Sequence, residues 1–190
     1  ALSPAAFIVD ADRAVDIAAE FLTLQRDTIC ATVAAEIERR LKLQQAGSML
    51  PFTVIDAGGR VVGIIPKALV EREWAHEGCD ELHIVDTMHE RKRMMMERAD
   101  AFLALPGGIG TFEELFEVWA WRQLGYHDKP IGILSSRGYY TSMMAFMQQV
   151  VQDGFMGEWQ MELVQAGEDA APLLRQLVQA AGFNPPSHPE

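Results

Sequence analysis

The stretch AFLALPGGIGTFEE, residues 101–114, decides the fold of this chain. A short apolar run ends at Pro106, a glycine-rich turn follows, and a helical pattern opens at Thr111. A buried strand that leads through a glycine turn into a helix presents backbone N–H groups to an anion, and glycine lets the backbone approach that anion closely. The stretch therefore predicts a phosphorylated ligand, with the Glu114 carboxylate one turn into the helix.

Apolar runs alternate with helical patterns from residue 57 onward. Strands are predicted at Val61–Ile65, Leu82–Val85, Ala101–Leu105 and Ile131–Leu134, and helices at 87–98, 111–124 and 139–152. Such alternation is typical of βαβ units, so we expect an α/β fold with a Rossmann-like parallel sheet flanked by helices on both faces. Ligands of these sheets bind beyond the carboxyl ends of the strands, which is where the turn after Leu105 lies.

Further strands and helices are predicted before residue 57 and at the C-terminal end. Short strands are expected at Phe7–Asp10 and Phe52–Ile55, and helices at 11–24, 28–45 and 169–181. We expect one domain over residues 1–182 and a disordered tail over residues 183–190, because the tail is rich in proline and polar residues.

Composition excludes several classes of protein. A chain of 190 residues with 49% hydrophobic content can bury one full core. The net charge of −11 argues against general binding to nucleic acid or to anionic membranes, and the apolar runs are all too short to span a bilayer. Cys30 and Cys79 show neither disulfide-framework nor zinc-site spacing. We therefore expect a cytoplasmic protein without a metal site.

Glu114 has two interpretations. Thr111 and Glu114 fit a T-x-x-E capping box, in which the carboxylate only caps the helix. Alternatively, the helix is buried on two sides, because apolar residues occupy most of its circumference. In that interpretation Phe112, Leu115, Phe116 and Trp119 face the sheet, and Glu114 lies opposite them with Glu117, Val118 and Trp121. Glu114 would then lie at a partly enclosed site, where its pKa can be tuned.

Two cations of the preceding helix, Arg91 and Lys92, also have both a structural and a functional interpretation. Thr87 and Glu90 form a second capping box, and Arg91 and Lys92 flank an apolar stripe. In the structural interpretation their aliphatic chains pack on the protein and their charged groups reach into water. In the functional one the arginine guanidinium forms paired hydrogen bonds with a phosphate or carboxylate. His127 follows a helix C-terminus, where the helix dipole alone favours histidine, so we expect no catalytic role for it.

These motifs resemble those of the LOG ("Lonely Guy") family, the cytokinin riboside 5′-monophosphate phosphoribohydrolases formerly labelled lysine decarboxylases. The resemblance covers residues 57–73, 85–134 and 138–155. The family motif P-G-G-x-G-T-x-x-E is matched by Pro106, Gly107, Gly108, Gly110, Thr111 and Glu114. The motif M-H-x-R-K is matched by Met88, His89, Arg91 and Lys92.

The resemblance implies a homodimeric nucleotide-binding enzyme that hydrolyses the N-glycosidic bond of an AMP-like nucleoside 5′-monophosphate without a cofactor. It implies that Arg91 and Glu114 are the catalytic pair. The substrate- and phosphate-binding residues that it implies are Met88, Lys92, Pro106, Gly107, Gly108, Ile109, Gly110 and Thr111. Our hypothesis is that Glu114 stabilises the oxocarbenium-like transition state or deprotonates water, while Arg91 orients Glu114 and the ribose phosphate.

Residues 1–56 depart from the family pattern. Family members carry a C-G-S-S-like turn and a second glycine cluster there, whereas this chain has ATVAAEIERRLKLQQ at residues 31–45. Two alternatives therefore stay open. One is a broader purine or pyrimidine 5′-nucleotide nucleosidase, and the other is a nucleotide- or phosphate-binding protein without turnover.

Overall fold

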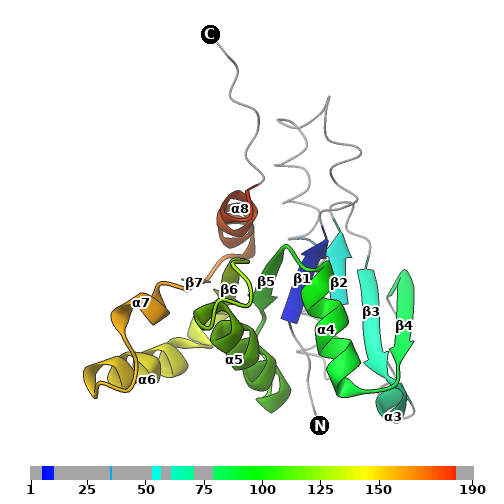
Figure 1. Ribbon diagram of the computed structural model, residues 1–190. Coiled ribbons are helices and arrows are strands. Elements are labelled where there is room, and N and C mark those ends of the chain that lie inside the picture. The colour runs from blue at the N-terminus through cyan, green and yellow to red at the C-terminus, as the bar shows by residue number, and fades with distance from the viewer. Residues whose placement is uncertain (1–5, 11–34, 36–52, 57–60, 71–78, 183–190) are drawn as a thin grey trace.

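The computed structural model describes residues 6–10, 35, 53–56, 61–70 and 79–182 (Figure 1). Residue 35 is helical. The helices expected at 11–24 and 28–45 otherwise lie outside the described residues, as does the tail expected at 183–190. The expectation of one domain over residues 1–182 stays a prediction for the same reason.

One seven-stranded sheet organises the described residues, in the strand order β4-β3-β2-β1-β5-β6-β7 (Figure 1). The strands are β1 (Ala6–Asp10), β2 (Thr53–Asp56), β3 (Val61–Pro66), β4 (Glu81–Val85), β5 (Ala101–Ala104), β6 (Ile131–Leu134) and β7 (Val164–Gly167). All strands predicted from the sequence are present within a residue or two. The strand β7 was not predicted, because its VQAG sequence has a single β-branched residue.

The strand directions confirm an α/β fold and correct one detail of it. The pairs β3–β4, β5–β6 and β6–β7 are parallel, as is β1–β2, whereas β1–β5 and β2–β3 are antiparallel. The expected Rossmann-like parallel sheet is thus present, except that β1 and β2 run opposite to the other strands. Only four residues separate β2 from β3, and a parallel connection needs a crossover of a dozen or more.

The helices follow the strands in alternation. They are α3 (Lys67–Val70), α4 (Met88–Arg98), α5 (Ile109–Gln123), α6 (Thr141–Gln152), α7 (Glu158–Met161) and α8 (Ala170–Ala180), with a 3-10 turn at Ser136–Gly138. The one-turn helices α3 and α7 were not predicted, because a single turn has no periodicity to detect. Within the described ranges, no helix is long and apolar enough to cross a membrane.

Helices cover both faces of the sheet, as predicted. Successive side chains of a strand point to opposite faces, and β5 shows this directly. Phe102 and Ala104 pack in the cluster that includes Met95 of α4 and Leu115 of α5. Leu103 belongs to a second cluster with the leucines of α8. Figure 1 shows α4 crossing in front of the sheet, with its N-terminus beside the end of β4.

Candidate functional site

The glycine turn opens α5 two residues earlier than expected. The helix begins at Ile109 with Gly108 as its N-cap, so Thr111 occupies the third helical position and is fully buried. The prediction of a capping box at Thr111 and Glu114 is therefore wrong. The low helix propensity of glycine concealed the true start. As a result, Glu114 lies inside the helix, and capping no longer explains it.

The N-terminus of α5 has the form of an anion site. Gly108 has no side chain, and no side chain of the described residues caps the first turn. The first N–H groups of a helix lack intrahelical partners, and the helix dipole places partial positive charge beside them. Fifteen residues of regular helix stand behind this turn. The arrangement can therefore accept a phosphate at the backbone.

Neighbouring side chains fix the conformation of the turn. A Cβ atom at Gly107 would lie 2.1 Å from Thr111 Oγ1, so a side chain cannot fit there. The hydroxyl of Tyr139 donates a hydrogen bond to the Gly107 carbonyl oxygen at 2.7 Å. The buried Tyr140 hydroxyl donates to the Leu105 carbonyl oxygen at 2.5 Å. Both tyrosines follow β6, the strand beside β5, so the turn is held from the adjacent strand end.

No role was predicted for these two tyrosines, although the segment that resembles the family includes them. Their position could have indicated a role in the site, because Tyr139 and Tyr140 lie just past β6, whose carboxyl end adjoins that of β5.

The structure buries Arg91 at the start of α4. The capping box of this helix is confirmed, since Glu90 N–H donates to Thr87 Oγ1 and Thr87 N–H donates to Glu90 Oε2, both at 3.1 Å. Arg91 is 2% exposed, and its Nη1 atom lies 3.9 Å from the Met88 sulfur. The charged head of Arg91 therefore does not reach into water.

Glu114 is the second buried charged residue of the pair. Its side chain is 6% exposed, and its Oε2 atom has no hydrogen-bond partner within the described part of the chain. Burial raises the pKa of Glu114 to about 9, although the nearby positive charge of Arg91 acts in the opposite direction. The carboxyl is therefore protonated at neutral pH. A carboxyl with such a pKa, inside the helix that follows a glycine turn, is a candidate acid–base group.

The buried face of α5 differs from the predicted one. Leu115 and Trp119 are buried as expected, but Phe116 is 38% exposed. Thr111 and Glu114 take its place on the inner face. The spacing of i, i+3, i+4 and i+8 is that of one helix face. The sequence misplaced Glu114 because a carboxylate is not expected among buried residues.

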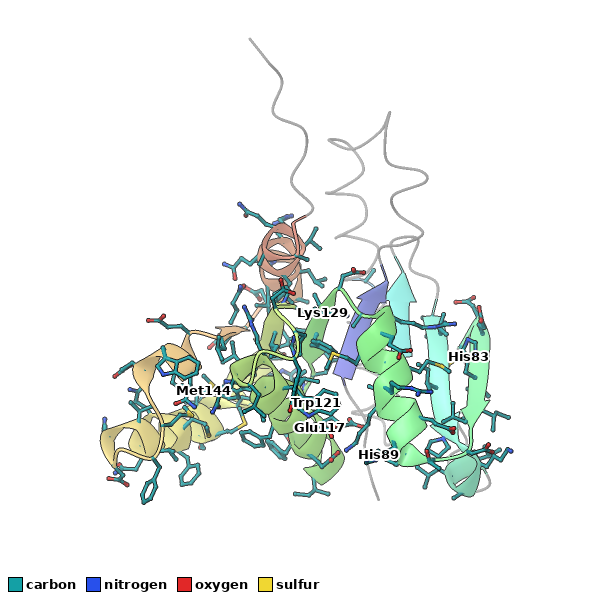
Figure 2. The ribbon with its side chains drawn as sticks, viewed as in Figure 1. His83, His89, Glu117, Trp121, Lys129 and Met144 are labelled. Atoms are coloured by element: carbon teal, nitrogen blue, oxygen red, sulfur yellow. The ribbon has the colours of Figure 1, made fainter. Side chains whose placement is uncertain are left out.

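The Lys92 ammonium is held by two carboxylates of α5. It forms ion pairs with Glu113 and with Glu117, the second at 3.0 Å. A pocket of about 230 Å³ lies next to these groups, lined by His89, Glu90, Lys92, Arg93, Glu117 and Trp121. Figure 2 shows Glu117 and Trp121 on α5 and His89 on α4 at the sides that the two helices turn toward each other. Glu114 does not line this pocket.

His127 has structural contacts. Its Nδ1 atom accepts a hydrogen bond from the Lys129 N–H group at 3.2 Å, so its Nε2 atom carries the proton and donates to the Val118 carbonyl oxygen at 2.9 Å. Burial lowers the pKa of His127. The ring therefore secures the loop after α5. Across the described ranges, no group of three His, Cys, Asp or Glu residues could hold a metal ion.

Comparison with known proteins points to one family. A family model described as "Possible lysine decarboxylase" matches residues 49–177. The cytokinin riboside 5′-monophosphate phosphoribohydrolase LOG3 of Arabidopsis thaliana is 45% identical over 128 residues, which are 67% of this chain and 60% of the relative. LOG2 of the same plant is 42% identical over 147 residues, 74% of this chain and 69% of the relative. LOG5 is 40% identical over 172 residues, 87% and 69% of the two chains. The chain thus spans about two thirds of the length of these relatives.

Proposed function

Because this chain belongs to the LOG family, we propose that it hydrolyses the N-glycosidic bond of a nucleoside 5′-monophosphate to free base and ribose 5-phosphate. The relatives bear the name of cytokinin riboside 5′-monophosphate phosphoribohydrolases. The observation that carries the proposal is the buried Glu114 carboxyl, with its raised pKa, beside the Arg91 charge and inside the helix that the glycine turn opens.

The phosphate of the substrate binds at the N-terminus of α5 in this proposal. Its oxygens accept hydrogen bonds from the backbone N–H groups of Gly107, Gly108, Ile109 and Gly110, in the turn between Pro106 and Thr111. Met88 lies against Arg91 and contributes apolar surface to the substrate. A phosphate at this point brings the ribose toward the inner face of α5, where Glu114 lies.

Glu114 serves first as an acid and then as a base. Its carboxyl is protonated at neutral pH before the reaction, and it donates this proton to the base nitrogen as the C1′–N bond breaks. The bonding electrons leave with the base, and the ribose becomes an oxocarbenium-like cation. The resulting carboxylate stabilises that cation and takes a proton from the water that attacks C1′. The free carboxyl is thereby restored.

Arg91 orients the reacting groups. Its buried guanidinium favours the ionised form of Glu114, so it stabilises the carboxylate at the moment when the proton leaves. A guanidinium in this place can also fork onto the ribose phosphate. We further propose a homodimer, as the resemblance implies, and a cytoplasmic location, which the cysteine pattern favours. The half-exposed Phe116 on α5 suits a surface that a second copy covers.

Release of free base tests the proposal. The chain is incubated with AMP, with isopentenyladenosine monophosphate and with a pyrimidine 5′-monophosphate, and the free base is measured by chromatography. We expect base from AMP or its isopentenyl derivative. Equal rates with the pyrimidine nucleotide would indicate the broader nucleosidase. If no nucleotide yields base while AMP still raises the melting temperature, the chain binds nucleotides without turnover and the proposal is wrong.

A further inference from the structure

Lys92 connects two helices at a partly enclosed point. Its side chain is only 15% exposed, and its ammonium pairs with Glu113 and Glu117 of α5. The chain thus places the charged end of an α4 residue between two carboxylates of the neighbouring helix. Screening by water is weaker at such a point, so the ion pair with Glu117, whose side chain is 25% exposed, is stronger than an exposed one, whereas the side chain of Glu113 is 54% exposed.

Lys92 offsets the repulsion between the two carboxylates. Glu113 and Glu117 lie four residues apart on α5, so their like charges face each other along one side of the helix. Lys92 is the cation paired with both of them in the described structure. Removing it would leave two adjacent negative charges and would break the ion pairs that Lys92 of α4 makes with α5.

The ion bridge that Lys92 forms with Glu113 and Glu117 lies one residue away from the proposed catalytic pair on both helices. Lys92 follows Arg91 on α4, and Glu113 precedes Glu114 on α5. Neighbouring residues of a helix share one rigid backbone, so the bridge restricts how far α4 and α5 can slide or rotate against each other. Such motion would separate Arg91 from Glu114, and displacements of about 1 Å are enough to cost catalysis about 100-fold.

The bridge also balances the charge around Glu114. The positive charges of Arg91 and Lys92 lower the pKa of Glu114, whereas the negative charges of Glu113 and Glu117 raise it. Without Lys92, the negative charges of Glu113 and Glu117 still raise the pKa of Glu114, and of the two cations only Arg91 still lowers it. The proton on Glu114 would then be held more tightly.

We infer that Lys92 is a positioning residue: its double ion bridge to Glu113 and Glu117 fixes α4 against α5 and thereby holds Arg91 in place beside Glu114. This inference rests on the proposed function. It differs from the role that the resemblance implies for Lys92, since the ammonium acts on two carboxylates of the chain rather than on the substrate.

A charge swap tests the inference. The variant Lys92→Met removes the bridge, whereas the double variant Lys92→Glu with Glu113→Lys again places one ammonium among two carboxylates, the second being Glu117. We expect Lys92→Met to lower kcat for AMP at least about tenfold with KM changed less than about twofold, and the swap to restore kcat to within about threefold of the wild type. If both variants instead raise KM more than about tenfold, Lys92 binds the substrate and the inference is wrong.

Arg93→Met provides the matched control, because Arg93 is exposed on the same helix and, among the described residues, forms its ion pair within that helix, with Glu97 at 3.7 Å. It should leave kcat within about twofold. If the wild type itself releases no base, the proposed function fails, and the pH dependence of unfolding then tests the inference alone. In Lys92→Met, the fall in stability that Glu114 causes with rising pH should extend to higher pH than in the wild type. An unchanged dependence would overturn the inference.

Discussion

Replacing Glu114 with glutamine should stabilise the protein while it abolishes activity. The folded-state pKa of about 9 is well above the ordinary value of 4.5. Between these two values the folded chain holds a proton that the unfolded chain releases, so Glu114 lowers stability as the pH rises through this range. At pH 7, about 2.5 pH units above the ordinary value, the cost is about 3 kcal/mol. Glutamine does not titrate in this range, so this cost disappears.

The net gain is smaller than that figure, because the amide of glutamine is also polar and buried. A buried amide without full hydrogen bonding costs about 1 kcal/mol on the scale of protein mutations. We therefore expect Glu114→Gln to gain about 2 kcal/mol at pH 7, or about 4 to 8 °C in melting temperature for a chain of this size. The gain should grow by about 1.4 kcal/mol for each pH unit between pH 5 and 8.

Urea unfolding at several pH values measures this gain. The control is Glu97→Gln, which removes an exposed carboxylate on α4 and should change stability by less than about 0.5 kcal/mol. A Glu114→Gln variant that is less stable than the wild type at pH 7 would mean that Glu114 is ionised and paired with Arg91 in the resting protein. A gain that does not vary with pH would mean that Glu114 does not hold an extra proton in the folded chain.

Three substitutions and one pH profile test separate parts of the site. Arg91→Lys keeps the charge but loses the fork, so the rate of base release should fall at least about 100-fold while the circular dichroism spectrum is unchanged. In Gly107→Ala the new Cβ would meet Thr111 Oγ1, so urea unfolding should show a loss of about 1 to 3 kcal/mol together with weaker AMP binding. Tyr139→Phe removes the hydrogen bond to the turn and should raise KM in steady-state assays at a cost of about 1 kcal/mol in stability. In the wild type, kcat should fall as the pH rises through about 9, because Glu114 then loses the proton that it donates; a rate that rises there would contradict the acid role.

Most of the sheet could be predicted from the sequence, because its strands are short apolar runs bounded by turn residues. The alternation of β5 and β6 with helices is local information that the chain carries directly. The direction of β1 and β2 could not be predicted in this way. It depends on which strands become neighbours, and the pattern of one strand does not specify its partners.

The site could be predicted in composition but not in geometry. The glycine turn, Arg91 and Glu114 stand out as residues in motifs. The sequence from Thr111 to Glu114, however, is compatible both with a helix that begins at Thr111 and with one that begins before it. The structure moves that start to Ile109 and turns Glu114 inward. Burial of the Arg91 charge and the bridge at Lys92 depend on how α4 packs against α5, which helical periodicity alone does not determine.

The most direct test of the account is a comparison of AMP with adenosine under the same conditions, with free adenine and ribose 5-phosphate both measured. We expect one ribose 5-phosphate for each adenine released from AMP, and a rate from adenosine at least about 100-fold lower, because the N-terminus of α5 then has no phosphate to bind. Adenine released equally fast from adenosine would contradict the phosphate site. A complete lack of adenine from AMP would contradict the proposed reaction itself.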